Sequence, residues 1–416
     1  MSTNLKIALR FLFFKKRAML MTLSGIIFGV AFFILTQAQT SGFEQFFIRT
    51  ILGTDGALRV TDRIQETYAS RKIAAESNNP DDSLLIETQR KFIEGIDYPN
   101  RLNAILRAMP EVSGTAEVVR GQAKIDSNTR SYDANAFGIN LKEFRAVSSL
   151  ENQVVSGDLS EFEKRPQGAL VGAGLAQRVN VRPGDEFTLT VGNTSQRFSV
   201  SGIFETGVGD IDKVRVIIHR NAARSLLGRP FGATYLQVSL EDPDRAPAIA
   251  YRLEPLLQHS IAPWQRREKV WLDVFRALRF SSAITVSTII LVSALGMFNT
   301  LAMLVIEKTR EIAILRSFGF SKSDVTRIFL WLGWVVIIAG STLGCAVGAL
   351  LTWAAGNIPL RIRGIFSTDH FVVSWNINHY LAAVVTAVIV VSIASYFPAR
   401  RAARIEPGDI IRGASS

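Results

Sequence analysis

Four long stretches without a charged side chain constrain this chain more than any other feature. They lie at residues 18–38, 281–306, 328–353 and 380–397, and none of them contains Asp, Glu, Lys or Arg. The hydrocarbon core of a bilayer is about 30 Å thick and takes about 20 apolar residues to cross as a helix. A charge at its centre costs about 3 kcal/mol. The sequence therefore predicts an α-helical membrane protein with four transmembrane helices.

The first stretch has some features of a secretory signal peptide. Lys15, Lys16 and Arg17 precede it, and a small residue, Ala38, ends it. Signal peptides have apolar cores of about 7–15 residues, and this stretch is longer. We therefore expect residues 18–38 to be a retained membrane anchor.

Loop charge predicts the orientation of the spans. Residues 1–17, 307–327 and 398–416 carry net charges of +5, +2 and +2, out of +11 for the whole chain of 416 residues. Lys and Arg concentrate in cytosolic loops. We expect both termini and the 307–327 loop to be cytosolic, and residues 39–263 and 354–379 to face outward from a bacterial inner membrane. The pI of about 9.9 then results from the basic residues of the cytosolic segments. No basic patch indicates a nucleic-acid partner.

The outward segment 39–263 predicts a mixed α+β domain. Several of its runs are alternating or β-branched and are separated by Gly, Asn and Asp, as is typical of strands and turns. Most of them fall within residues 125–225, which indicates a β-rich subdomain inserted into an αβ one. A polar run at 74–83 is typical of a loop or an insertion. The strand candidates are "GALRV", "EVVRGQAKI", "DEFTLTV", "QRFSVSGIF", "KVRVIIH" and "TYLQVSL".

Two amphipathic segments flank the spans. Residues 264–280 repeat apolar positions at three- and four-residue spacing among charges, which predicts a helix running without a break into the second span. It is either a solvated helix packed on its own domain or a rigid stalk that carries motion. Residues 1–17 predict a cytosolic amphipathic helix lying on the lipid surface. Its apolar face would consist of Leu5, Ala8, Leu9, Leu12 and Phe13.

Glycines within two of the spans indicate close helix packing. Gly340, Gly344 and Gly348 recur every four residues, and Gly25 and Gly29 repeat the spacing in the first span. Small residues one turn apart let helix backbones approach closely in a membrane. Four helices make a thin bundle, so we expect a second copy or a related subunit to complete it.

The sequence contains no recognisable catalytic motif. The nucleotide-binding pattern GxxxxGK[ST], the metalloprotease pattern HExxH and the hydrolase pattern GxSxG are all missing from it. Asp210 and Asp212 lie in a Gly-rich turn, and aspartates in such a turn more often shape it than bind metal. Cys345 lies within an apolar run and is expected to be inert. We therefore expect neither a metal, a cofactor nor an enzyme activity in this chain, and another chain would supply the energy.

The segment 307–327, "EKTREIAILRSFGFSKSDVTR", lies between two spans and has a helical pattern. Ile312, Leu315, Phe318 and Gly319 fall on one side, with charges around them. An apolar ridge flanked by charges suits docking into the groove of a partner, with charge fixing the register. The same pattern suits a short helix lying on lipid. The surrounding charges are Lys308, Glu311 and Arg316.

This organisation resembles the transmembrane subunits of mechanotransmission-type ABC transporters. That group contains the macrolide exporter, the division-associated permease and the lipoprotein-releasing permeases, and this chain most resembles the last. The resemblance spans nearly the whole length and rests on several motifs in the family's order. They are "FGINLKEF", "VVSGDL", "GALVGAGLAQRVNVRPGDEFTLTV", "FSVSGIFETGVGDID", "IAPWQ", "EKTREIAILRSFGFS" and "YFPARRAARIEPGDIIRG".

The resemblance implies a partner and a mechanism. A dimer of ABC-type ATPase subunits, which binds ATP and Mg²⁺, would hold a coupling helix in this chain, and stalks would transmit its closure to the outer domain. The implied substrate is a lipoprotein or other amphiphile, handed to an extracytoplasmic acceptor protein by a homo- or heterodimer of permeases. Residues 63–98 have no place in the family pattern. The implied contacts with the ATPase are Glu307, Lys308, Arg310, Glu311, Ile312, Leu315, Arg316, Phe318 and Gly319.

Other functions stay open at the level of sequence. The chain could export a small lipophile or glycolipid. It could instead be a non-transporting regulator that transmits the state of a cytosolic ATPase to an extracytoplasmic enzyme. A membrane-anchored receptor without any ATPase would tolerate charge reversal in the 307–319 helix, which separates this class from the others.

Overall fold

A computed structural model describes residues 7, 8, 10, 16–70, 86–127, 130–359 and 370–404. Most of the predicted helix at 1–17, the polar run at 74–83 and the tail beyond Arg404 lie outside these residues. The chain divides into two compact units. The first, called the helical unit below, comprises Met1–Gln45, Asp273–Leu360 and His370–Ser416, and the second, called the large domain, comprises Phe46–Leu272 and Arg361–Asp369.

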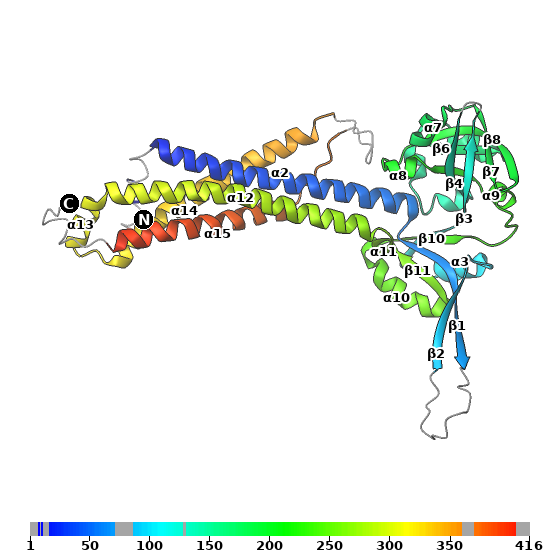
Figure 1. Ribbon diagram of the computed structural model, residues 1–416, viewed down its shortest axis with the longest axis horizontal. Helices are drawn as coiled ribbons and strands as arrows, with labels where there is room; N and C mark the ends of the chain where they lie inside the picture. The colour runs from blue at the N-terminus through cyan, green and yellow to red at the C-terminus, as the bar shows by residue number, and fades with distance from the viewer. Residues whose placement is uncertain are drawn as a thin grey trace, which may run out of the picture. The chain divides into compact units, whose positions relative to one another are not determined.

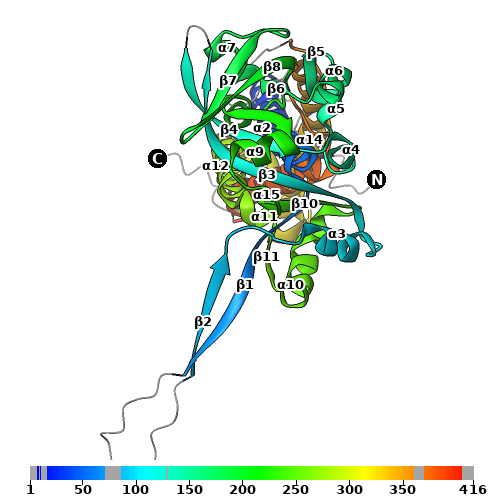
Figure 2. The same cartoon turned by 90° about the vertical axis from the view of Figure 1, so that its right-hand side faces the viewer.

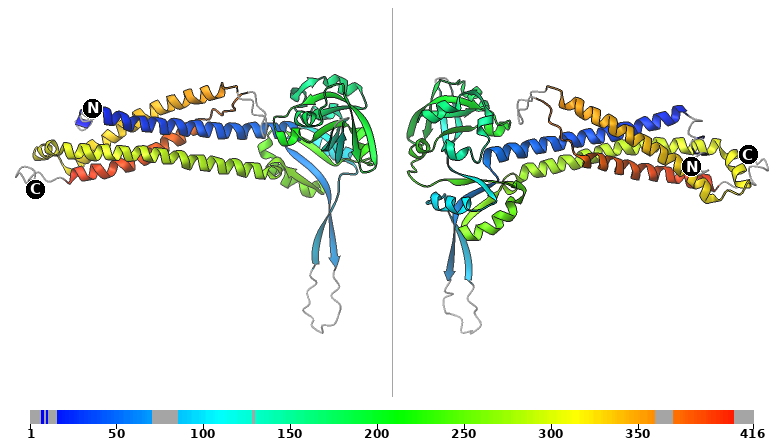
Figure 3. Two further views of the ribbon diagram at one scale, coloured as in Figure 1. Left: turned by 45° about the horizontal axis from the view of Figure 1, so that its top comes forward. Right: turned by 180° about the vertical axis from the view of Figure 1, so that it is seen from behind.

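The helical unit is built from long apolar helices that run alongside one another (Figures 1 and 3). Four helices are long and apolar enough to cross a membrane within the part of the chain that the structure describes. The prediction of four transmembrane helices is thereby confirmed. The helices are α2 (Lys16–Asp55), α12 (Lys269–Glu307), α14 (Lys322–Gly356) and α15 (Ile377–Ala403), and the short α13 (Thr309–Ser317) joins α12 to α14.

Two of these helices extend beyond the predicted spans at 18–38 and 281–306. Both α2 and α12 continue into the large domain, where the sequence turns from wholly apolar to amphipathic. The segment predicted as one helix over 264–280 is divided in the structure, because Glu268 leaves helical geometry with φ −100° and ψ 21°. A four-residue helix, α11 (Trp264–Arg267), precedes this break, and α12 follows it.

The large domain contains an 11-stranded sheet within its described residues, in the order β11-β1-β10-β3-β4-β9-β6-β8-β5, with β2 beside β1 and β7 beside β3 and β8 (Figure 2). The pairs β4–β9 and β6–β8 are parallel, and the other pairs are antiparallel. The strands are β1 (Leu58–Ser70), β2 (Ile86–Ile93), β3 (Val112–Asp126), β4 (Ser131–Ile139), β5 (Val154–Gly157), β6 (Gly168–Gly172), β7 (Glu186–Val191), β8 (Thr194–Phe204), β9 (Arg215–His219), β10 (Tyr235–Leu240) and β11 (His259–Pro263).

Short helices cover this sheet and complete its cores. They connect successive strands, as expected where the chain must return across a sheet. The helices are α3 (Pro99–Arg107), α4 (Leu141–Phe144), α5 (Leu150–Gln153), α6 (Leu159–Lys164), α7 (Ala173–Val179), α8 (Gly209–Asp212), α9 (Arg220–Leu226), the 3₁₀ helix η1 (Pro243–Arg245) and α10 (Ala246–Leu257).

Strand β3 divides the sheet into two subdomains. Its first half pairs with β10, and its second half pairs with β4 and β7. One hydrophobic core lies among β3, β4, β6, β7, β8 and β9, and a separate one joins β1, β10 and β11 to α3 and α10. We call these parts the β-rich subdomain and the αβ subdomain. A third core, which includes Phe144, Leu150, Phe162 and Phe204, packs α4, α5 and α6 on the β-rich side.

The predicted strands all occur, which confirms the mixed architecture of the domain. The six runs named from the sequence fall in β1, β3, β7, β8, β9 and β10. The described residues within 63–98, which no family pattern placed, include the far half of β1 and all of β2. These two strands pair from Arg63 opposite Ile93 to Ser70 opposite Ile86. The pairing makes a two-stranded ribbon at the edge of the sheet (Figure 2).

Candidate coupling site

The segment predicted to dock a partner forms a short helix held tightly at both ends. Helix α13 begins one residue after α12 ends, since only Lys308 separates them. Gly319 ends α13 with φ +95°, a left-handed conformation that favours glycine. Ser321 then caps α14, accepting from Asp324 N at 3.2 Å while the Asp324 carboxylate accepts from Ser321 N at 3.1 Å. This capping box fixes where α14 begins.

The face that α13 exposes differs from the one predicted. Ile312 is 1% exposed and packs in the core of the helical unit, and its neighbour Ala313 is also buried. Lys308 is also buried, at 9% exposure. The exposed apolar side chains are Ile314 at 47% and Phe318 at 82%, which lie one helical turn apart. The apolar ridge therefore runs over Ile314 and Phe318, and Ile312 anchors the helix from the opposite side.

Charges frame this ridge. Glu307, Arg310 and Glu311 are exposed beside it, and the Lys308 ammonium forms an ion pair with the Glu311 carboxylate. Leu315 and Arg316 are half-buried, and Gly319 is exposed. Exposed apolar residues are common on the spanning helices, where lipid can cover them. Phe318 is different because it lies in a charged connection between two spans.

The glycines predicted to mediate packing lie against neighbouring helices of the same chain. A Cβ added at Gly340, Gly344 or Gly348 would lie 2.8, 2.8 or 3.0 Å from the nearest side-chain atom of α2. At Gly25 and Gly29 the neighbours are on α12, each at 2.8 Å. These distances are shorter than ordinary van der Waals contacts, so a side chain at any of these positions would displace its neighbour, whereas glycine lets the helices approach closely. The contacted α2 residues are, in order, Ile26, Val30 and Ile34, and the α12 residues are Ser293 and Ile290.

The aspartates considered as a metal pair have a different environment. Asp212 is buried and accepts hydrogen bonds from Thr206 N at 2.9 Å, Thr206 Oγ1 at 2.8 Å and Gly207 N at 3.2 Å. Burial raises the pKa of this carboxyl above its ordinary value, and the hydrogen bonds oppose that change. Asp210, by contrast, is exposed. Asp212 therefore shapes the turn before β9, and no His, Cys, Asp and Glu cluster able to hold a metal occurs among the described residues.

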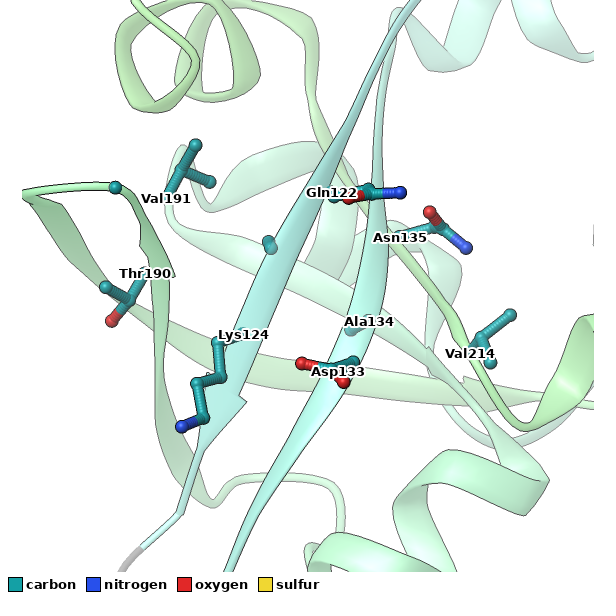
Figure 4. A pocket seen from close by; sticks show the side chains of 10 residues that line it. Gln122, Lys124, Asp133, Ala134, Asn135, Thr190, Val191 and Val214 are labelled. Atoms are coloured by element: carbon teal, nitrogen blue, oxygen red, sulfur yellow. The ribbon is translucent and has the colours of Figure 1, made fainter.

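A shallow groove of about 370 Å³ lies on the β-rich subdomain (Figure 4). It is formed by β3, β4, the β7 end and Val214, and its walls carry Lys124 and Asp133 together with amide and hydroxyl groups. The groove combines opposite charges with neutral polar groups.

Comparison with protein-family models identifies the class of protein to which this fold and this site belong. A MacB-like periplasmic core domain matches residues 19–256, and an FtsX-like permease C-terminal domain matches residues 283–407. The first match covers more than half of the chain. The chain therefore belongs to this family, the ABC transporter permeases of the MacB and FtsX type, and is an inner-membrane protein.

The relatives narrow the class further. The lipoprotein-releasing system transmembrane protein LolC of Xylella fastidiosa is 25% identical, over 98% of each chain. Its counterpart LolE from Haemophilus influenzae is 24% identical, over 93% of this chain and 92% of that one. The crystal structure of the periplasmic region of MacB from Actinobacillus actinomycetemcomitans aligns with 53% of this chain and 94% of that one, at 12% identity and a TM-score of 0.34. The chain is thus an ABC transporter permease of the LolC, LolE and MacB type.

Proposed function

We propose that this chain is the permease subunit of a complex that uses ATP hydrolysis by a separate ABC ATPase to release a lipid-anchored protein from the inner membrane. The lipid-anchored substrate is inferred from the names of the LolC and LolE relatives. The ATPase is a dimer, so two permease copies, identical or related, complete the assembly. An acceptor protein takes the released substrate.

The observation that carries the proposal is the exposed ridge of Ile314 and Phe318 on a helix fixed between two spans. An aromatic side chain that is 82% exposed beside charged residues is typical of an anchor that enters a pocket on a partner. The charges around it would set the register of docking. Because Ile312 and Ala313 are buried on the opposite side of the same helix, force applied to the ridge passes directly into the bundle.

The orientation follows from charge. The segments 1–17, 307–327 and 398–416 carry the excess of Lys and Arg, which favours the cytosolic side. The ATPase then meets α13 in the cytosol, and the large domain lies on the opposite side of the membrane. Since the spans contain no charged residue, the substrate does not pass through a polar channel between them.

Co-purification of an ATPase with the tagged full-length chain in a mild detergent tests this proposal. Phe318→Ala removes the anchor, and Phe231→Ala is its matched control, since Phe231 is 76% exposed in the large domain. Loss of an anchor side chain costs about 2 kcal/mol of binding, which is a roughly 30-fold weaker complex.

We expect the ATPase with the wild type and with Phe231→Ala, and little or none with Phe318→Ala. Reversing two charges, with Glu311→Lys and Arg316→Glu together, should also remove it. A wild-type chain that brings no ATPase under several gentle conditions would refute the proposal. An ATPase that hydrolyses ATP without any substrate release would instead indicate a regulator that transmits the state of the ATPase.

A further inference from the structure

The last turn of α2 is held in part by the β-rich subdomain. The helix ends at Gly56, whose φ of +64° stops it. The carbonyl groups of a final helical turn lack partners within the helix. Here Gly53 O accepts from Ser149 N at 2.7 Å and from Ser148 Oγ at 2.8 Å. Both serines lie in the segment between α4 and α5, which packs on the β-rich side.

An ion pair reinforces this attachment. The Asp55 carboxylate, on the final residue of α2, lies 3.1 Å from the Arg215 guanidinium at the start of β9. The two side chains are 11% and 9% exposed. Arg215 also stacks on the Phe137 ring, 4.3 Å from its centroid, which fixes the direction of the guanidinium. Because 160 residues separate the partners, the pair joins two distant parts of the chain.

The short helix α11, which leads into the other long helix, is attached to the αβ subdomain. Trp264, which opens α11 just before α12, donates from its indole Nε1 to Pro243 O at 2.9 Å and from its backbone N to Ala57 O at 2.9 Å. Gln265 also donates to Pro243 O, at 3.3 Å. These partners belong to η1 and to the residue before β1, both in the αβ subdomain. The αβ subdomain also holds the end of α2, because Gln237 of β10 donates to Thr54 O at 3.1 Å, and Ile48 and Leu52 pack against its core. The end of α2 therefore lies where the two subdomains meet.

The junction concentrates positive charge around one carboxylate. Arg59 lies 3.5 Å from Asp55, and Arg267 donates to Gly56 O at 3.0 Å. Burial, with repulsion from Arg59, lowers the pKa of Arg267 to about 10. Burial likewise raises the pKa of the neighbouring Glu268. Removing the Asp55 charge would leave buried guanidinium groups without compensation, so loss of this carboxylate should weaken the attachment strongly.

We infer that the Asp55–Arg215 ion pair is the joint that couples the β-rich subdomain to the end of α2 and to the αβ subdomain beside it. The inference deepens the proposed function, since that function supplies the motion of the long helices. A helix is stiff along its axis, so a displacement of α2 reaches its last residue, Asp55. The paired charges transmit it at the only described contact in which an acid of α2 meets a base of the β-rich subdomain.

Two charge-removing variants test the joint in the full-length chain reconstituted with its ATPase. Asp55→Asn and Arg215→Gln should each retain ATPase binding and basal hydrolysis. Both should lower the substrate released per ATP by about 2- to 30-fold, the range over which coupling residues act. The double variant should lower the substrate released per ATP by no more than the worse single variant does, because the two charges act as one pair. Glu111→Gln is the control, since it breaks the exposed pair with Arg252 in the same domain.

A distance measurement tests the joint without relying on the ATPase. Spin labels at Glu186→Cys in β7 and Tyr251→Cys in α10 report the separation of the two subdomains, in a Cys345→Ala background that removes the single native thiol. Asp55→Asn should broaden the distance distribution in the nucleotide-free chain, and Glu111→Gln should leave it unchanged. If Asp55→Asn fails to fold, Arg215→Lys keeps the charge while altering its geometry, and it should broaden the distribution less.

The outcomes separate the two proposals. A wild type that binds no ATPase overturns the proposed function, and the distance distributions then decide on the joint alone. Folded Asp55→Asn and Arg215→Gln variants with wild-type distances and wild-type release per ATP would overturn the joint. A loss of release in Glu111→Gln equal to that in Asp55→Asn would also overturn it, since the effect would then be general to the domain.

Discussion

Replacing Gly344 by alanine tests the packing of α14 on α2 most sharply. The added Cβ would lie 2.8 Å from Val30 Cβ, 2.9 Å from Val30 Cγ1 and 3.1 Å from Ile27 O. Carbon atoms in contact normally lie about 3.5–4.0 Å apart, so the helices must separate by about 1 Å. Overpacking of this kind costs about 1–3 kcal/mol. Alanine also gains about 1 kcal/mol over glycine in a helix, which offsets part of that cost.

A second glycine separates these two effects. At Gly296 in α12 the added Cβ would meet only Thr22 Cγ2, at 3.7 Å, which is an ordinary contact. Gly296→Ala therefore gains the helical preference without the clash. The free energy of unfolding should be about 1–3 kcal/mol lower for Gly344→Ala than for Gly296→Ala, because the preference cancels in the comparison.

The single cysteine makes the assay direct. Cys345 neighbours Gly344 on α14 and is partly buried, so its rate of thiol labelling during an SDS titration in mixed micelles reports the opening of this interface. Adding Val30→Gly to Gly344→Ala removes the contacted Cβ and should recover part of the loss. Equal unfolding midpoints for Gly344→Ala and Gly296→Ala would show that α14 does not pack on α2 as described.

Three further variants test local features. Asp212→Asn should become less stable relative to the wild type as the pH falls from 7 to 4, because burial raises the pKa of Asp212 and its protonation then favours the folded state. Hydrogen exchange near Thr206 measures the stability difference between the two proteins. A difference that does not change with pH would count against this prediction. Ser321→Ala should lower the stability of α14 by about 1 kcal/mol and speed amide hydrogen exchange over its first turn, since it removes the capping box with Asp324. Unchanged exchange would contradict the assignment of Ser321 as the helix cap. Gly56→Ala should destabilise the large domain by about 1 kcal/mol or more, measured by thermal unfolding, since its φ of +64° strains any other residue, and an unaltered melting temperature would refute this.

The architecture could be predicted from local sequence patterns, because the burial of apolar side chains that creates those patterns also determines the fold. A run of about 20 residues without charge has few stable places other than a bilayer, and alternation such as "DEFTLTV" suits a strand with one buried face. The break at Glu268 was missed. The residues around it, from Trp264 to Phe280, keep a helical spacing throughout. Hydrogen bonds to distant segments, from Trp264 to Pro243 O and from Arg267 to Gly56 O, hold α11 just before the break, and no local pattern reveals them.

The short helix at the candidate site was predicted, but the side that it exposes was not. Helix α13 is nine residues long and has apolar side chains on more than one side. Ile312 and Ile314 are equally apolar, so sequence alone cannot tell which of them faces the bundle. The structure decides it by burying Ile312.

Contacts between distant segments were beyond sequence reasoning. Asp55 and Arg215 carry no local signature, and each is one charged residue among many in the large domain. The four-residue glycine period predicted a packing face on α14 but could not name α2 as the helix opposite it. That assignment depends on how the spans assemble.

The proposed function claims that an ATPase acts through α13 to release a lipid-anchored protein. The most direct test reconstitutes the full-length chain with its ATPase in proteoliposomes that contain a fluorescent lipoprotein, and measures its transfer to the soluble fraction. The wild type and Phe231→Ala should release it with ATP and not with a non-hydrolysable analogue, whereas Phe318→Ala should release little. Release that does not depend on ATP, or that is equal in Phe318→Ala and Phe231→Ala, would contradict the claim.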